Sequence, residues 1–465
     1  MPKSGAATGG FGDNPIDPRP LRHWIAILGL RRGARSAPRR SSFRASDEHA
    51  LMSAILSTDR ATLPSDADAT RRPQVLFVLT GNAYVNSRAL KQLRALSSQG
   101  FACTVLHWVD PSAPPVTPPG IPHITWVKLP RPGGAGPRFF WRIHRTTVQY
   151  LHDRLGTLPD HPFDALHASD LYVLPALVAF AKQHGLFVSY DARERYPYVH
   201  GTVGKPWARL LWWQLERRAL PQVNAAFTVS PSIAGHIQQS YACPRPAVVY
   251  NYPDWQAATA PIDLRRELNI HPKTPIVMHQ GQLRAGRGCD TLIEAMVHLP
   301  TARLVFLGDG PAREGLIAQA HALGLQDRIH FVPAVAPADL PGMTQQATVG
   351  VTLLHDTCLN HRFALPNKLF EYLEAGLPVV GSHLPEIQRV LVGPTGTSPV
   401  GAVVDPHDAR SVAKGIQSVL DRFGLSRLSE DDRQRIRETY GWETTGKPTF
   451  LQPFMSFFAS SLPTV

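Results

Sequence analysis

The stretch Val75-Leu76-Phe77-Val78-Leu79-Thr80-Gly81-Asn82 decides the fold. Its five successive apolar residues predict a strand that is covered on both faces. Thr80-Gly81-Asn82 then forms a tight turn, and residues 87–99 have the pattern of a helix. A strand, a tight turn and a helix make up the unit from which parallel α/β sheets are built.

The same unit recurs along the chain. Further strands are expected at residues 102–107, 123–129, 164–167, 186–190, 225–229 and 247–250, with helical segments between several of them. A second series follows Pro272, at residues 276–278, 304–307, 329–332, 349–354, 378–381 and 402–404. The alternation predicts an α/β protein with two doubly wound parallel sheets, each covered by helices on both faces.

The domain organisation follows from these two series. A chain of 465 residues exceeds the size of a single ordinary core. We expect a disordered basic extension at 1–72, an N-terminal domain at 73–255, a linker at 256–271, a C-terminal domain at 272–425 and a helical tail at 426–465. Two domains joined by a short linker can close on a ligand between them.

The composition narrows the class of protein. With 43% hydrophobic and 18% charged residues, the chain resembles a soluble enzyme and is not disordered as a whole. The cysteines are scattered without metal-ligand spacing, so we expect no metal site and no disulfide framework. The net charge of +12 favours anionic partners such as nucleotide diphosphates or lipid headgroups. Since no nucleic-acid-binding module is recognisable, nucleic acid is not an expected partner.

No apolar run is long enough to cross a bilayer. The short apolar patch at residues 24–30 precedes an arginine-rich run. We therefore expect a cytoplasmic protein, and peripheral attachment to an anionic membrane surface at the inner face of the cell membrane is compatible with this patch. The alternative is a basic extension without a role.

Two loops that follow strands of the second series suit a ligand, because open parallel sheets bind ligands beyond the carboxyl ends of their strands. The first is Gly281-Gln282-Leu283-Arg284-Ala285-Gly286-Arg287-Gly288. Its glycines allow close approach of the backbone, and its arginines suit phosphate oxygens; the alternative is a plain turn with solvated arginines. The second, Gly308-Asp309-Gly310-Pro311, could also accept a ligand closely, although such turns are common connections.

A third loop carries the strongest pattern, Leu365-Pro366-Asn367-Lys368-Leu369-Phe370-Glu371-Tyr372. Proline at the start of a helix leaves N–H groups free, and Lys368 adds a positive charge beside them. Glu371 lies one turn later on the same face as Lys368. Such a pair could hold a diphosphate and the ribose next to it; the alternative is an ordinary ion pair on a solvated helix.

These three loops, in this order, resemble the retaining glycosyltransferases of the GT-B architecture, family 4 or glycosyltransferase group 1 type. The resemblance extends from Gln74 to about Phe450. It implies two facing Rossmann-like domains and a C-terminal crossover helix near Gly441-Trp442-Glu443. It also implies retaining transfer of a sugar from a nucleotide-sugar donor to a hydroxyl of a glycan or lipid-linked acceptor, without a cofactor, in the synthesis of a surface glycan, polysaccharide or glycolipid.

The resemblance also assigns roles to residues. Arg287 and Lys368 would be catalytic, because they would stabilise the charge of the leaving diphosphate. Donor binding would involve Gly281, Arg284, Gly286, Gly308, Gly310, Asn367, Leu369 and Glu371. The acceptor side would include Asn82, Arg88, Asp170 and Glu194.

Three positions depart from the family's pattern. Arg193 replaces a histidine, Gln282 replaces an arginine, and Phe363 replaces the first of two glutamates. Other polar residues of the last loop could contact the sugar instead, namely His355, Asp356, Asn360 and His361. These departures leave open a catalytically silent nucleotide-binding protein, and the fold leaves open a nucleotide-sugar epimerase or phosphorylase.

Overall fold

A computed structural model describes residues 71–134, 136–155, 162–254 and 260–459. The expected extension at 1–72 lies outside this range except for its last two residues, and so does the beginning of the expected linker. In the described part, no helix is both long enough and apolar enough to span a bilayer.

The first sheet has seven parallel strands in the order β3-β2-β1-β4-β5-β6-β7. They are β1 (Gln74–Leu79), β2 (Ala102–Val109), β3 (Ile124–Pro130), β4 (Ala165–Ala168), β5 (Phe187–Ala192), β6 (Ala225–Thr228) and β7 (Ala247–Val248). The chain runs from β1 outward to β3 and then returns to the other side of β1. This reversal leaves a crevice at the carboxyl ends of β1 and β4, where such sheets bind ligands.

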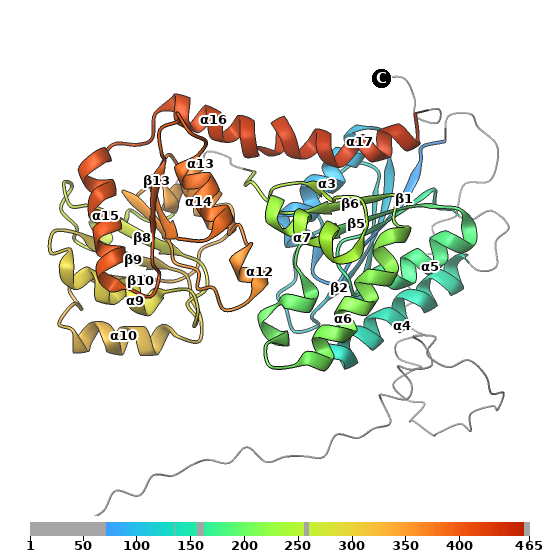
Figure 1. Ribbon diagram of the computed structural model, residues 1–465, viewed down its shortest axis with the longest axis horizontal. Helices are drawn as coiled ribbons and strands as arrows, with labels where there is room; N and C mark the ends of the chain where they lie inside the picture. The colour runs from blue at the N-terminus through green and yellow to red at the C-terminus, as the bar shows by residue number, and fades with distance from the viewer. Residues whose placement is uncertain (1–70, 135, 156–161, 255–259, 460–465) are drawn as a thin grey trace, which may run out of the picture. The chain divides into compact units, whose positions relative to one another are not determined.

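Helices cover this sheet on both sides (Figure 1). They are α3 (Ser87–Ser98), α4 (Gly136–Leu155), α5 (Leu174–His184), α6 (Pro206–Ala219) and α7 (Pro231–Tyr241). Val75 and Phe77 of β1 pack with α3 in one buried cluster, to which Phe450 and Phe454 of the C-terminal helix α17 (Lys447–Phe457) also belong. The apolar run that predicts the strand is thus buried as expected.

The second sheet repeats this topology with six parallel strands in the order β10-β9-β8-β11-β12-β13. They are β8 (Ile276–Gln280), β9 (Arg303–Leu307), β10 (Ile329–Val332), β11 (Val349–Thr352), β12 (Val379–Ser382) and β13 (Gly401–Val404). Successive residues of β8 enter different buried clusters, Val277 with α9 (Cys289–Ala295) and Met278 with α13 (Asn367–Glu374). The sheet therefore has a core on each face.

Every expected strand is present, with ends that shift by two residues at most. The strand at β8 is longer than expected because its last two residues, His279 and Gln280, are polar but buried. Polar side chains interrupt the apolar run by which a strand covered on both faces is recognised, so the sequence places this end too early.

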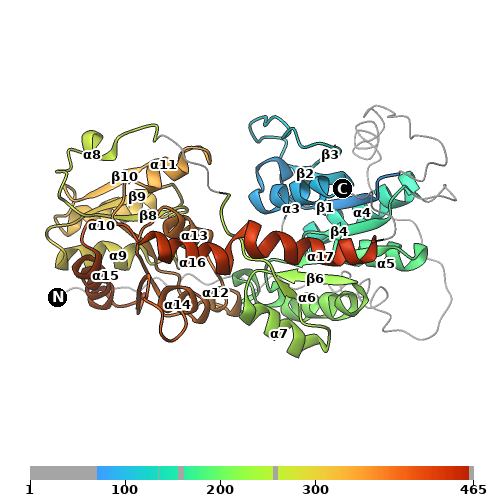
Figure 2. The same cartoon turned by 90° about the horizontal axis from the view of Figure 1, so that it is seen from above.

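The C-terminal segment returns to the first sheet. It consists of α16 (Glu430–Tyr440), a π-helical turn (Trp442–Gly446) and α17. Figure 2 shows α17 lying across the first sheet, where it contacts α3 and β7. The expected fold, two Rossmann-like parallel sheets with a C-terminal crossover helix, is confirmed.

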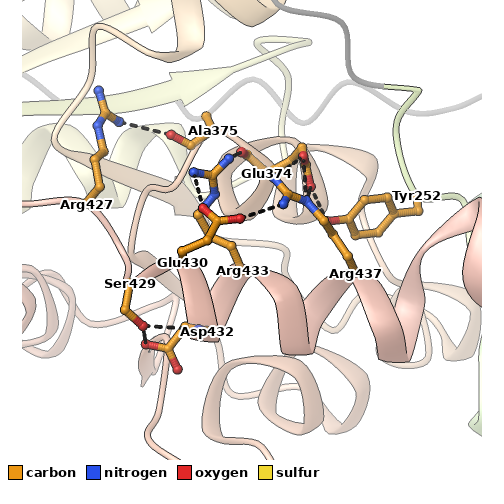
Figure 3. A network of polar contacts seen from close by, with 9 residues as sticks. All are labelled: Tyr252, Glu374, Ala375, Arg427, Ser429, Glu430, Asp432, Arg433 and Arg437. Carbon is orange, nitrogen blue, oxygen red and sulfur yellow. Dashed lines mark hydrogen bonds and ion pairs between the residues drawn. The ribbon is translucent and has the colours of Figure 1, made fainter.

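A polar network fastens α16 to α13, the helix that begins with the third loop (Figure 3). The buried Glu374 carboxylate accepts hydrogen bonds of 3.0 and 2.8 Å from the Nε and Nη2 atoms of Arg437, and another from the Tyr252 hydroxyl. Glu430 accepts from Arg437 and Arg433 at 2.8 and 2.9 Å. These bonds fix the C-terminal end of α13 and thereby limit how far its first turn can move.

Candidate functional site

A cavity of about 550 Å³ lies at the carboxyl ends of β8 and β9. Its walls come from the first two loops, from the first turn of α13, and from Ala334, Val335 and Leu340, which follow β10 and were not expected from the sequence. Six residues with expected roles line it together: Gly281, Arg287, Gly308, Asn367, Lys368 and Glu371.

Lys368 is the lysine that lines this cavity. Its Nζ atom is 3.1 Å from Nε2 of His279. Burial, with the repulsion of Arg287, lowers the pKa of Lys368 to about 8. Burial and the two nearby cations hold the pKa of His279 well below its usual value, so the neutral imidazole accepts a hydrogen bond from Lys368. This contact orients the ammonium group without neutralising it.

Gln280 orients the carboxylate of the site. Its side-chain amide donates to Glu371, and its carbonyl oxygen accepts from the Thr344 hydroxyl at 2.9 Å. Burial raises the pKa of Glu371, while the bond from Gln280 and the charge of Lys368 act against this rise. Sequence reasoning missed Gln280 and His279 as supports of the site. The available signal was a pair of polar residues at the end of a buried strand, directly before Gly281.

Arg287 lines this cavity as well as a second, larger one. Burial, followed by the repulsion of Arg284, lowers the pKa of its guanidinium. Among the described residues, neither Arg284 nor Arg287 forms an ion pair with a carboxylate. Unpaired guanidinium donors in a partly buried wall suit a phosphate group, which offers several acceptor oxygens.

The second loop, Gly308-Asp309-Gly310-Pro311, packs against the backbone of the first loop, Gly281 to Gly288. A Cβ atom on Gly308 would lie 2.2 Å from the carbonyl oxygen of Gly281, and one on Gly310 would lie 2.2 Å from that of Leu283. Both glycines have positive φ, 145° and 159°. They therefore let this turn pack against the Gly281–Arg287 backbone, and only Gly308 reaches the cavity wall.

The larger cavity, of about 760 Å³, is lined by residues that follow strands of both sheets. Arg88, Glu194, Arg284, Arg287 and Asn367 belong to its wall, as do Arg193, Asn360 and His361. Burial raises the pKa of Glu194, and the charges of Arg193 and Arg284 oppose the rise. These effects indicate that the three side chains lie near one another.

Five of the expected residues line neither cavity, and Gly310 of the second loop is the first of them. The Leu369 side chain is buried, and its N–H donates to Pro366 at 3.0 Å. Asp170 is buried and accepts two bonds from Thr80, which tie the loop after β1 to the loop after β4. The remaining two stabilise turns: Asn82 caps a 3₁₀ turn through Tyr84, and Gly286 has a φ of 78°.

Phe363, which replaces a family glutamate, is directed to α7. Its ring centroid lies 6.1 Å from that of His236, and its carbonyl oxygen accepts from the Ser230 hydroxyl at 2.9 Å. Asn360 lies three residues earlier, in the short helix α12 (Leu359–Arg362), and accepts from the backbone N–H of Arg195 at 2.9 Å. Asn360 and His361 line the larger cavity, whereas Asp356 pairs with Arg362 at 3.3 Å.

Arg88 lines the larger cavity, but its guanidinium group forms a buried ion pair with Asp191. Its Nε and Nη2 atoms bond the two oxygens of buried Asp191 at 2.6 and 2.7 Å, and Nη1 bonds the carbonyl of Val249 at 2.6 Å. Burial alone would raise the pKa of Asp191, but the charge and hydrogen bonds of Arg88 outweigh it and hold this pKa at about 2.

We expect Asp191→Asn to reduce the free energy of unfolding near neutral pH by about 2 kcal/mol, because the depressed pKa measures stabilisation by the ionised form. This stabilisation is complete above the unfolded-state pKa of about 4 and is lost as pH falls through about 2. The difference between wild type and variant in urea unfolding should therefore shrink on acidification. Exposed Asp327 provides the matched control, Asp327→Asn. A difference that stays constant down to pH 2 would contradict the assignment.

Among the described residues, no group of three histidine, cysteine or carboxylate side chains could hold a metal ion.

Two families match the chain, one for each sheet. Residues 85–253 match the glycosyl transferase 4-like domain, and residues 262–438 match the family glycosyl transferases group 1. A D-inositol 3-phosphate glycosyltransferase of Xylanimonas cellulosilytica is 29% identical over 192 residues, which are 40% of this chain and 43% of that protein. The lipopolysaccharide core biosynthesis glycosyltransferase LpsE of Rhizobium meliloti is 28% identical over 37% of this chain and 47% of that protein. The chain thus spans less than half the length of these relatives.

Solved structures show the same fold. Sucrose-phosphate synthase from Thermosynechococcus elongatus superposes with a TM-score of 0.66 at 17% identity, over 84% of this chain and 100% of that one. HepE from Anabaena, in complex with UDP and glucose, superposes with a TM-score of 0.57 at 16% identity, again over 84% and 100%.

Proposed function

Because the chain belongs to the group 1 glycosyltransferases of the GT-B fold, we propose that it transfers a sugar from a nucleoside-diphosphate donor to a hydroxyl acceptor, with retention at the anomeric carbon. The single observation that carries this proposal is the convergence of Lys368, Arg287 and Glu371 on one cavity. Two cations and one carboxylate match a diphosphate and its ribose.

The donor half of the site would work by stabilising charge. As the bond between sugar and diphosphate breaks, negative charge develops on the leaving phosphate oxygens. Lys368 is oriented by His279 before the reaction begins. Arg287 forms no ion pair with a carboxylate among the described residues, so its charge is available to the phosphate oxygens. Preorganised donors of this kind contribute on the order of 3 kcal/mol each to catalysis. Glu371, held by Gln280, would accept hydrogen bonds from the ribose hydroxyls.

The acceptor would enter the larger cavity. Its wall contains Arg193, Glu194, Asn360 and His361, which could bind the transferred sugar and the acceptor in place of the missing family glutamate. One of the named relatives acts in lipopolysaccharide core biosynthesis, so we infer an acceptor that is a glycan or a lipid-linked molecule. Determination of the anomeric configuration of the product by NMR tests retention.

Titration calorimetry with UDP, GDP, ADP and TDP tests the donor site. We expect one of these nucleotides to bind the full chain, and the corresponding nucleotide-sugar to be consumed when an acceptor is present. Absence of binding by all four would refute the proposal. Binding without turnover, whatever acceptor is supplied, would instead identify a silent nucleotide-binding protein.

The pH dependence of this binding gives a second test. Lys368 loses its proton as pH rises through about 8, so nucleotide affinity should fall about tenfold between pH 7 and pH 9. Lys368→Arg is the matched control because arginine keeps its charge over this range. Whatever its absolute affinity, this variant should show a flat profile. An equal fall in both proteins would assign the effect to another group.

A further inference from the structure

Helix α6 presents an apolar surface to solvent. Val203, Trp207 and Leu210 are 55%, 54% and 57% exposed, although all three are large hydrophobic residues within eight positions of one another. The opposite side of the helix is buried, with Trp212 only 5% exposed. We define the α6 surface as Val203, Lys205, Trp207, Arg209 and Leu210. Figure 1 shows α6 on the outer side of the first sheet.

The charges around this surface have one sign. Lys205, Arg209 and Arg217 are exposed, and the only acidic side chain between residues 199 and 219 is Glu216. Glu216 is completely buried in an ion pair of 2.6 Å with Arg195. Two of these cations form cation–π contacts with aromatic rings. Arg209 lies 4.2 Å from the ring centroid of Tyr198, and Arg217 lies 4.9 Å from that of Trp213. Within residues 199–219, no exposed carboxylate balances this positive charge.

We propose that the α6 surface docks the protein on a bilayer that contains anionic lipids. Exposed tryptophan and aliphatic side chains partition into the headgroup region, and flanking cations are attracted to anionic headgroups. A second copy of this chain fits less well, because each copy carries a net charge of +12. The segment 1–70 has the same sign of charge, since its lysines and arginines outnumber its acidic residues. Nucleic acid would satisfy the cations but would leave Val203 and Leu210 exposed to water.

Helix α6 contacts the wall of the proposed acceptor cavity through its buried side, opposite to the α6 surface. Tyr196 lines that cavity, and the 3₁₀ turn Tyr196–Tyr198 packs against α6. The Tyr196 ring centroid lies 6.2 Å from that of Trp212, on the buried side of the helix. In a docked protein, helix α6 would lie between the headgroup layer and the cavity wall, and this short separation favours a lipid-linked acceptor. This last step rests on the proposed function, whereas the docking itself does not.

Cosedimentation with vesicles tests the docking with the full chain. The wild type should bind vesicles of phosphatidylglycerol and phosphatidylcholine, but not vesicles of phosphatidylcholine alone. The double variant Trp207→Ser, Leu210→Ser should bind at least about tenfold more weakly, because both apolar contacts are lost. The matched control is the double variant Val297→Ser, Leu323→Ser in the C-terminal domain. It also removes two exposed hydrophobic side chains, which are 49% and 42% exposed in the wild type. It should bind like the wild type.

Quenching by brominated lipids tests whether Trp207 itself enters the bilayer. Trp207→Phe should still bind vesicles, but it should lose most of the quenching that the wild type shows. Equal binding of the two double variants, or equal quenching of wild type and Trp207→Phe, would overturn the proposal, as would absence of binding to anionic vesicles. Nucleotide affinity should be the same in all variants. If no nucleotide binds, the proposed function fails while the vesicle result still decides the docking.

Discussion

Lys368→Ala is expected to lower the rate of sugar transfer by a factor of about 10² to 10³, which corresponds to the loss of one preorganised donor at the leaving group. The ammonium lies in the cavity shared with Arg287 and Glu371, and it is oriented by a 3.1 Å contact with His279. Alanine removes both the charge and the donor. Nucleotide affinity should fall less than the rate does, because the charge on the diphosphate grows as the glycosidic bond breaks.

The rate is measured with the donor that calorimetry identifies, at saturating concentration. Lys414→Ala removes an exposed lysine from α15 (Ala409–Phe423) and serves as the matched control, with an unchanged rate expected. Thermal unfolding of both variants checks that the fold is retained. Transfer by Lys368→Ala at the wild-type rate would refute the catalytic assignment and leave a binding role at most.

Gly308→Ala is expected to damage both the fold and the donor site. The new Cβ would lie 2.2 Å from the Gly281 carbonyl oxygen, and φ at this position is +145°. Backbone must therefore move, at an expected cost of about 3 kcal/mol or more in unfolding free energy. Because Gly281 lies beside Lys368, the displaced loop would also change the wall on which the ammonium packs. Loss of nucleotide binding should accompany the loss of stability.

Gly315→Ala is the matched control for this substitution. Gly315 lies in α10 (Arg313–Ala322), and a Cβ there would meet nothing within 4 Å. Alanine in a helix interior is more favourable than glycine by about 1 kcal/mol, so this variant should be slightly more stable than the wild type. Urea unfolding measures both effects. A Gly308→Ala protein with wild-type stability and nucleotide affinity would show that the turn does not support the loop.

The two sheets could be predicted because their signal is local. An apolar run that ends in a glycine turn and leads into a helix has few alternatives, and it occurs in both halves of the chain. The C-terminal crossover helix was expected from family resemblance, whereas its packing depends on Phe450 and Phe454 entering the core of the first sheet. Nothing in the spacing of these phenylalanines specifies which distant strands they contact.

The candidate site was predictable only in part. The loop positions of Lys368, Arg287 and Glu371 follow from the rule that ligands bind at the carboxyl ends of parallel strands, and the structure brings these three together. Their actual roles remain predictions. For Arg88 and Asp170 the structure shows strong internal bonds that the sequence did not reveal, with Asp191 in the first case and Thr80 in the second.

The order of residues along the chain was sufficient for the strands, the helices and the loops that line the smaller cavity, because each depends on neighbours within a few positions. Pairing over long distances was not accessible in this way. Gln280 and Glu371 are 91 residues apart, and Lys368 and His279 are 89 apart. Such contacts arise only when parallel strands set their loops side by side, so folding alone decided which side chains orient the cations and the carboxylate.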